Sequence, residues 1–248
     1  MKLAVILPAA GLGTRMSRAG AAPAEFFGSS RKQFMELEGA PILVHTARKF
    51  VESPLVHEIV VAVRAEDIDW VAELLQPEGQ QLPGGLRVVA GGDSRQESVE
   101  CAFNVLPTDT DLVAVHDAVR PFIDPDTIRR VVEAAEETGA AIVGVVPVDT
   151  VKQVSGAQAG GARVRATISR ERLVLAQTPQ VFRYEVLRRA FAKAREDCFA
   201  GTDESSLVEH LDDVEISVVP GSERNIKITR PSDMDLARLL FEQETART

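Results

Sequence analysis

Short apolar segments alternate along the chain with stretches in which apolar side chains recur every three to four positions. The apolar segments are rich in Val and Ile and nearly continuous in hydrophobicity, which is typical of strands that are buried on both faces. Five such strands are predicted at Leu3–Leu7, Glu58–Val63, Leu86–Ala90, Asp111–His116 and Ala141–Val148.

Helical patterns fill the intervals between these strands. Four helices are predicted: one opening at Pro41, then Asp67–Gln76, Ser94–Leu106, and one after Asp124. Asp124 is suited to cap its helix, with Pro125 at the first helical position. Strand–helix alternation predicts a three-layer, Rossmann-like α/β fold with a mostly parallel central sheet. Ligands in such folds bind beyond the carboxyl ends of the strands.

The segment Asp149–Arg170 interrupts this rhythm and resembles a two-stranded ribbon with its turn at Gly156–Gly161. An isolated two-stranded ribbon is only marginally stable, so we expect this one to pack on another surface, such as a second subunit. The remaining elements are predicted as a helix at Tyr184–Glu196, strands at Val214–Val219 and Ile226–Thr229, and a final helix after Pro231.

Length and charge narrow the class of protein. The chain has 248 residues, 45% of them hydrophobic, and we expect one domain over residues 1–248 with a dimerisation arm at about 149–170. The net charge of -9 argues against a nucleic-acid or anionic-membrane partner. No apolar run approaches the ~20 residues of a membrane span. Cys101 and Cys198 match no metal-site spacing, which favours free thiols in a reducing cytoplasm.

A glycine loop, Pro8–Met16, follows the first strand. Its small residues let backbone amides approach a phosphate or a base, although a plain glycine turn has the same pattern. A dinucleotide fingerprint needs a small residue where Met16 stands, and the Gly-Lys-Ser/Thr of a P-loop is absent. The cation Arg15 lies on the loop and the pair Arg31-Lys32 follows, which suits a polyphosphate.

Two more strand ends carry candidate chemistry. Gly91–Ser98 opens a helix, and its spacing of Ser94 and Glu97 is that of a capping box. A helix start of this kind also favours the hydrogen-bond acceptors of a ligand. Asp117 follows the fourth strand, where it would touch a sugar hydroxyl or a metal ion, or merely cap a loop. Three such strand ends in one sheet favour a binding site.

Seven motifs occur in one order along the chain: Pro8–Met16, Arg31-Lys32-Gln33, Gly92–Arg95, His116–Pro121, Thr178-Pro179-Gln180, Thr202-Asp203-Glu204 and Asn225–Thr229. Together they resemble the 2-C-methyl-D-erythritol 4-phosphate cytidylyltransferase family of the non-mevalonate isoprenoid pathway, from Leu3 to about Leu240. The resemblance implies transfer of a cytidylyl group from CTP to 2-C-methyl-D-erythritol 4-phosphate. The products are 4-diphosphocytidyl-2-C-methyl-D-erythritol and pyrophosphate.

The same resemblance implies roles for individual residues. Arg15 and Lys32 would hold the triphosphate and stabilise the transition state, while Arg170 and Lys227 would position the attacking phosphate. The CTP site would comprise Ala9, Ala10, Gly11, Gly13, Gly92, Asp93, Ser98, Asp117 and Ala118. The polyol-phosphate site would comprise Arg120, Thr150, Arg170, Thr202 and Lys227. The family implies that Thr150 and Arg170 reach the site from the ribbon of a partner subunit, in a homodimer with exchanged arms.

Elementary chemistry agrees with these roles. A phosphate monoester has a second pKa of about 6 and is mostly a dianion at neutral pH, so no catalytic base is needed. The obstacle is repulsion between two anions, which cations and Mg²⁺ bound mainly through the CTP phosphates would relieve. Protein ligands of the metal are not predicted.

The chain departs from the family pattern in two places. Residues 17–31 form a longer loop than the family leads us to expect, and Arg31 stands where Pro is common, which leaves Arg31 as a candidate to share the role of Lys32. The ribbon tip is extended too.

Other functions remain open at this stage. The alternatives are a ribitol-5-phosphate cytidylyltransferase, a non-catalytic nucleotide-binding regulator and a dinucleotide-dependent oxidoreductase. The regulator would not need the cations Lys32, Arg170 and Lys227, and Met16 disfavours the oxidoreductase.

Overall fold

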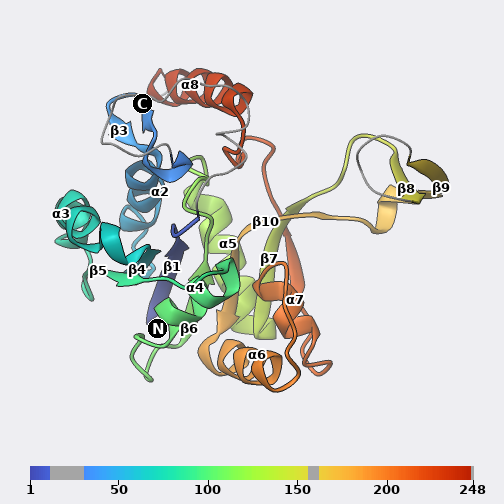
Figure 1. The fold of residues 1–248 in the computed structure, drawn as a ribbon, viewed down its shortest axis with the longest axis horizontal. Coiled ribbons are helices and arrows are strands. Elements are labelled where there is room, and N and C mark those ends of the chain that lie inside the picture. Colours follow the sequence, from blue (N-terminus) through green and yellow to red (C-terminus); the bar gives the residue numbers. More distant parts are fainter. Residues whose placement is uncertain (12–30, 156–161, 247–248) are drawn as a thin grey trace.

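A seven-stranded sheet forms the centre of the computed structural model, which describes residues 1–11, 31–155 and 162–246 (Figure 1). Its strand order is β11-β7-β10-β6-β1-β4-β5. Within this sheet β10 pairs antiparallel with β6 and β7, and the other pairings are parallel. The prediction of a mostly parallel sheet is confirmed. The strands are β1 Leu3–Pro8, β4 Val56–Val63, β5 Leu86–Ala90, β6 Leu112–Val115, β7 Ala140–Val145, β10 Leu175–Arg183 and β11 Ser217–Pro220.

Helices cover both faces of the sheet. Two of the predicted helix starts have the expected caps. The Ser94 side chain accepts a hydrogen bond from the Glu97 amide at 3.1 Å, and the Glu97 carboxylate accepts from the Ser94 amide in return. Asp124 accepts from the Thr127 amide at 2.8 Å. The helices are α2 Ile42–Val51, α3 Ile68–Gly79, α4 Arg95–Phe103, α5 Pro125–Thr138, α6 Tyr184–Glu196, α7 Glu204–Glu209 and α8 Pro231–Thr245, with short 3-10 helices η1 Lys32–Phe34, η2 Ala65–Asp67 and η3 Arg170–Arg172.

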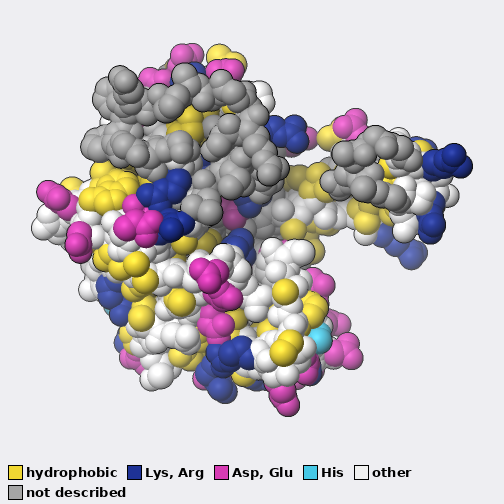
Figure 2. Space-filling model, in the orientation of Figure 1, with side chains coloured by type: hydrophobic (Ala, Val, Ile, Leu, Met, Phe, Trp, Pro, Cys, Tyr) yellow, Lys and Arg dark blue, Asp and Glu magenta, His cyan; other side chains and the backbone are white. Residues whose placement is uncertain are grey.

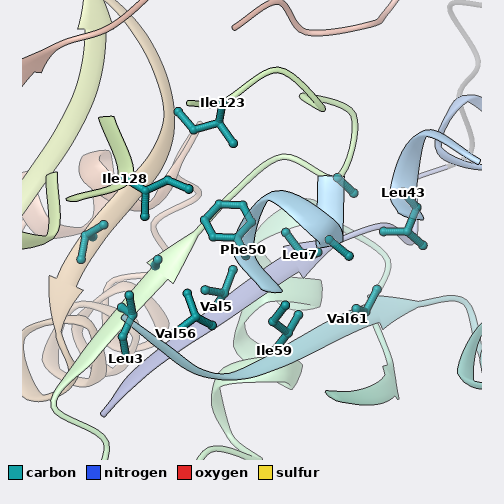
Figure 3. Packing of buried hydrophobic residues seen from close by; sticks show 14 of the residues in the cluster. Leu3, Val5, Leu7, Leu43, Phe50, Val56, Ile59, Val61, Ile123 and Ile128 are labelled. Atoms are coloured by element: carbon teal, nitrogen blue, oxygen red, sulfur yellow. The ribbon is translucent and has the colours of Figure 1, made fainter. Parts of the chain in front are cut away.

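Alternate side chains of the central strands enter two different cores. Leu3, Val5 and Leu7 of β1 pack with α2, α3 and α5 on one face. Figure 3 shows these strand residues beside side chains of α2 and α5. Ala4 and Ile6 pack with α4, α6 and α7 on the other. Burial on both faces explains why these strands are continuous apolar runs. A third, smaller core lies under α8.

The predicted strand Ile226–Thr229 is wrong, because this segment has no strand partner in the sheet. Its backbone is tied to the loop after β6 instead. The Ile228 amide donates to the Val119 carbonyl at 3.0 Å, and the fully buried Ile228 side chain packs in the core under α8. The alternating apolar pattern of this segment therefore reflects anchoring to the neighbouring loop and core, not membership of a sheet. Two further strands differ from the prediction by three residues at one end: β7 ends at Val145, not Val148, and β11 begins at Ser217, not Val214.

Strand β10 is absent from the predicted elements. Its centre contains Gln177, Thr178, Pro179 and Gln180, a polar run with a proline that does not look like a central strand. The pairing with β7 shifts register between Gln177 and Gln180, so this part bulges and its polar side chains turn toward the site described below.

The predicted ribbon is present as β8 Val151–Ser155 paired antiparallel with β9 Arg163–Ile168. It projects away from the sheet as an arm (Figures 1 and 2). Val154 and Val164 are 42% and 64% exposed, so the arm leaves part of its apolar surface uncovered in one chain. The predicted turn Gly156–Gly161 lies outside the described residues. A small hairpin, β2 Glu36–Leu37 and β3 Ala40–Pro41, precedes α2.

Phe50 provides a test of this packing. It is fully buried on α2 and lies edge-on to His116, with ring centroids 4.8 Å apart. We expect Phe50→Ala to lower the free energy of unfolding by about 3–5 kcal/mol, because it removes apolar contacts and leaves a cavity. Leu239→Ala on α8, where the side chain is 56% exposed, is the matched control and should cost under about 0.5 kcal/mol. Equal losses of unfolding free energy for the two variants, measured by urea unfolding, would contradict the placement of Phe50 in the core.

Candidate active site

The carboxyl ends of β1, β5 and β6 meet at one cavity of about 270 Å³. This is the edge at which ligands bind in parallel α/β sheets. Residues from η1 and from the segment before α8 complete the wall. The lining residues are Pro8, Ala9, Ala10, Gly11, Lys32, Gln33, Gly92, Asp93, Ser94, Arg95, Ser98, Asp117, Ala118, Val119 and Lys227.

Most of the predicted CTP-site residues therefore line a single cavity. The set comprises Ala9, Ala10, Gly11, Gly92, Asp93, Ser98, Asp117 and Ala118, and the predicted cations Lys32 and Lys227 lie with it. Gly13 and Arg15 lie outside the described residues.

Gln33 fixes the start of the glycine loop. Its side-chain amide is buried and donates to the Ala9 carbonyl at 2.6 Å and to the Gly11 carbonyl at 3.1 Å. These bonds tie η1, which carries Lys32, directly to the end of β1. The predicted sites did not include Gln33, although it stands inside the Arg31-Lys32-Gln33 motif.

Gly91 permits close approach of the two glycine-containing strand ends. A Cβ atom added to Gly91 would lie 2.8 Å from the Ser98 Oγ and 2.9 Å from the Ala10 Cβ. Only glycine fits such a gap without displacing the backbone. Gly92 is equally restricted, because a Cβ atom added to it would lie 2.4 Å from the Glu97 Cβ. The prediction named Gly92 and omitted its neighbour, though both were visible as a pair.

Asp117 is the electrostatic centre of the cavity. It is 6% exposed, and its carboxylate lies 2.9 Å from the Lys227 Nζ, 3.0 Å from the Arg120 Nε and 3.7 Å from the Arg95 Nε. Burial by itself would raise the pKa of Asp117, but Lys227, Arg95 and Arg120 outweigh it and hold the pKa well below its usual range. The carboxylate is thus ionised at neutral pH.

Arg95 links this centre to α7. Its Nη1 atom donates to both carboxylate oxygens of Glu204, at 2.7 and 2.8 Å. Glu204 is 1% exposed, and burial raises its pKa despite the stabilising charge of Arg95. Neither residue was among the predicted site residues. Arg95 looks locally like an ordinary first-turn residue of a capped helix, so its partner is visible only in the folded chain.

Buried amides and carbonyls hold the loop around Asp117. The Asp117 amide donates to the Thr178 hydroxyl at 2.9 Å, and the Arg120 Nη1 donates to the Asn225 carbonyl at 2.7 Å. The Asn225 side chain in turn donates to the Thr178 carbonyl at 2.9 Å. The polar centre of β10 and the segment before Lys227 therefore brace the same carboxylate.

A second cavity, of about 210 Å³, adjoins the first. It shares Arg95, Asp117 and Lys227 with the larger cavity and adds Arg120 and Thr202. Three of the predicted polyol-phosphate residues, Arg120, Thr202 and Lys227, thus lie together beside the predicted CTP site.

Thr150 and Arg170 are not brought to these cavities within one chain. Both are exposed at the base of the arm, where the Arg170 guanidinium donates to the Val148 carbonyl. Neither lines the two cavities around Asp117.

Arg31 lies next to Lys32 but does not line the 270 Å³ cavity. Its guanidinium forms two hydrogen bonds to Asp67 and lies over the Phe34 ring. This placement favours Lys32 over Arg31 as the cation that faces a ligand.

No metal site made by protein side chains alone is evident in the described part of the chain. Among the described residues, no group of three or more His, Cys, Asp or Glu side chains is placed to hold a metal ion. Cys101 and Cys198 are free thiols. None of the described helices is long and apolar enough to cross a bilayer.

His116 offers a test of the buried frame. Burial lowers its pKa to about 4, although the Arg120 carbonyl, 3.0 Å from the His116 Nε2, opposes the shift. Because the folded pKa lies below the unfolded value of 6.5, stability from neutral His116 is complete above pH 6.5 and is lost as the pH falls toward 4.

We therefore expect His116→Gln to weaken the pH dependence of unfolding. Between pH 7 and pH 4.5 the variant should lose on the order of 2 kcal/mol less stability than the parent chain, since about one fewer proton binds on unfolding. Urea titrations at several pH values measure this difference, in which contributions from other groups cancel. Parallel curves would place the proton uptake elsewhere.

Comparisons with known proteins agree with one family. The sequence model of the 2-C-methyl-D-erythritol 4-phosphate cytidylyltransferase family matches residues 3–243. The chain is 65% identical to the protein of that name from Solibacter usitatus (strain Ellin6076), covering 100% of this chain and 99% of the relative. It is 52% identical to the one from Acidobacterium capsulatum, covering 100% of both.

Solved structures give the same result. The 4-diphosphocytidyl-2C-methyl-D-erythritol synthase from Anaerococcus prevotii DSM 20548 matches with a TM-score of 0.80 at 26% identity, over 97% of this chain and 96% of that one. The 2-C-methyl-D-erythritol 4-phosphate cytidylyltransferase from Francisella tularensis matches with a TM-score of 0.76 at 31% identity, over 97% and 100%. The chain belongs to the 2-C-methyl-D-erythritol 4-phosphate cytidylyltransferase family.

Proposed function

We propose that this chain transfers the cytidylyl group of CTP to 2-C-methyl-D-erythritol 4-phosphate in the cytoplasm, in isoprenoid precursor biosynthesis. The products are 4-diphosphocytidyl-2-C-methyl-D-erythritol and pyrophosphate. The observation that carries the proposal is the meeting of three strand ends at one cavity, with a buried carboxylate and cations from distant segments. Membership of the family supports the choice of substrates.

The nucleotide would lie against the backbone of Ala9–Gly11 and the start of α4. Gly91 lets the end of β5 pack closely against Ala10 and Ser98, and Ser98 lines the same wall. The ribose would reach Asp117 and Ala118 at the end of β6. Lys32 would meet the triphosphate, together with Arg15 of the glycine loop.

The reaction needs positioning of charge more than proton transfer. A phosphate oxygen of the polyol phosphate forms a bond to the α-phosphorus of CTP, while the bond from that phosphorus to the bridging oxygen breaks and pyrophosphate leaves. The attacking phosphate is already mostly a dianion at neutral pH, so no side chain must remove a proton. Lys227, held at 2.9 Å by Asp117, would orient this phosphate, and Arg120 and Thr202 would contact the polyol.

Mg²⁺ fits this site as a companion of the nucleotide. Both oxygens of Asp117 already lie near cations, so the carboxylate is poorly suited to lead a protein-made metal site. Mg²⁺ commonly keeps several waters and binds through substrate phosphates with few protein ligands. When bound, it would neutralise charge on the triphosphate, and Lys32 would add to that effect from the protein.

A homodimer with exchanged arms would complete the acceptor site. Thr150 and Arg170 do not line the described cavities within one chain, and the arm exposes Val154 and Val164. The arm also carries the exposed cations Lys152, Arg163 and Arg165, although the whole chain has a charge of -9 (Figure 2). A basic, partly apolar arm is complementary to the surface of an acidic second copy.

The first test of this function is a substrate panel. Purified protein is assayed for pyrophosphate release with CTP, UTP, ATP and GTP, each against 2-C-methyl-D-erythritol 4-phosphate and ribitol 5-phosphate. We expect CTP with methylerythritol phosphate to give the highest kcat/KM, because a site that hydrogen-bonds the 4-amino edge rejects a base lacking it. Chelation of divalent cations should abolish turnover. Equal turnover of UTP and CTP would contradict the base assignment, and preference for ribitol phosphate would reassign the acceptor.

Mixing two inactive variants tests the shared site. Arg15→Ala and Arg170→Ala proteins are each expected to lose about 10²–10³-fold in kcat, the usual cost of one preorganised charge contact. If Arg170 acts across the dimer, mixed dimers hold one site with both defects and one with neither, so activity should partly return. Absence of recovery after subunit exchange has been demonstrated by mass spectrometry would exclude the shared site.

A further inference from the structure

Arg31 is bound to the start of α3. Its Nη2 atom donates to the Asp67 Oδ1 at 2.5 Å, and its Nη1 donates to Oδ2, so the guanidinium and the carboxylate meet as a two-pronged pair. The Trp70 indole N–H donates to the same Oδ1 at 3.1 Å. The Asp67 side chain is 5% exposed and that of Arg31 is 15% exposed, so solvent screens this pair little.

The other end of η1 is attached to the same place. The Phe34 ring lies edge-on to the Trp70 ring, with centroids 4.6 Å apart, and the Arg31 guanidinium is 5.1 Å from the centre of the Phe34 ring. Both residues that flank Lys32 and Gln33 are thus fixed to η2 and α3. We call Arg31, Phe34, Asp67 and Trp70 the η1 clamp.

Lys32 and Gln33 lie between these anchors and face the cavity. Gln33 binds the backbone after β1, as described above. Lys32 has a long, rotatable side chain, so the precision of its ammonium depends on how firmly its backbone is held. A displacement of about 1 Å at a reacting group can cost on the order of 100-fold in rate.

The electrostatics of Asp67 also favour a stable ion pair with Arg31. Burial alone would raise the pKa of Asp67, but hydrogen bonds from Arg31 and Trp70 lower it. Removing one partner would leave the other charge buried and poorly compensated.

We propose that Asp67 is a positioning residue that acts through Arg31 to hold Lys32 toward the triphosphate. This inference rests on the role of Lys32 in the proposed function. The competing assignment makes Arg31 itself a phosphate ligand. The two differ in sign for Asp67→Asn: the clamp requires a loss of rate, whereas a phosphate-binding Arg31 released from Asp67 would keep the rate or raise it.

A double-mutant cycle tests the proposal. Asp67→Asn retains size but removes the charge that Arg31 binds, and it should lower kcat by about 10- to 100-fold, with a smaller change in the two KM values. In a Lys32→Ala background the same substitution should have almost no further effect, because no ammonium remains to be positioned. Equal fold losses in both backgrounds, an unaffected kcat, or a fully active Lys32→Ala chain would each overturn the proposal.

Controls separate positioning from general damage. Glu66→Gln removes a neighbouring exposed carboxylate that pairs with Arg64, and it should leave kcat unchanged. Thermal unfolding shows whether Asp67→Asn is folded. If it is not, Trp70→Phe, which keeps a ring beside Phe34 and removes the N–H donor, is put through the same cycle and judged by the same criteria.

Hydrogen exchange measured by mass spectrometry tests the clamp independently of the proposed function. The Phe34 and Met35 amides donate to the Arg31 and Lys32 carbonyls at 3.0 and 3.3 Å, and we expect Asp67→Asn to speed their exchange. Faster exchange in a protein whose parent does not turn over CTP would reject the proposed function while leaving the clamp. Unchanged exchange in this segment would reject the clamp, whatever the activity.

Discussion

The buried carboxylate of Asp117 is the charge around which this molecule is arranged. Removing an ionised carboxylate from water costs several kcal/mol unless cations and hydrogen-bond donors replace the solvent. The replacements come from three separate parts of the chain: Arg95 at the start of α4, Arg120 in the loop after β6, and Lys227 before α8. Compensating this charge brings together three parts of the fold. They are the carboxyl edge of the sheet, the polar bulge of β10 and the segment after β11.

The same arrangement explains how an acidic chain prepares a site for polyanions. The larger cavity is lined by the cations Lys32, Arg95 and Lys227 and by the carboxylates Asp93 and Asp117, so its formal charge is three minus two, or one positive charge. These cations are already oriented by carboxylates and carbonyls before any ligand binds. Preorganised charge of this kind stabilises a developing anion without a further cost of reorganisation. The overall charge of -9 therefore says little about what the cavity binds.

Local patterns predicted what depends on local physics. The five strands, the Ser94 capping box and the Asp124 cap follow from side-chain periodicity and backbone hydrogen bonding within a few residues, and all were predicted. Burial on both faces was wrong for β5, which is a partly exposed edge strand. The pair Arg95–Glu204 joins residues 109 positions apart, and no local pattern contains it. The bulge of β10 and the anchored segment Ile226–Thr229 were not predicted for the same reason. The polar side chains of the bulge face the site, and the apolar side chain of Ile228 packs under α8, so neither segment has the pattern of a regular strand.

The cations assigned to catalysis differ in what holds them. Lys227 is fixed by Asp117, and the backbone of Lys32 is fixed by Gln33 and by the η1 clamp, so these two cations are held within one chain. Arg170 is held differently: its side chain is exposed, and its guanidinium donates to the Val148 carbonyl at the base of the arm. In the proposed dimer, ordering Arg170 requires the surface of the partner, and the entropy of fixing an exposed arginine is lost at assembly instead of at each turnover. Two cations held within the chain and a third ordered by association would place the cost of organising Lys32, Lys227 and Arg170 before the chemical step.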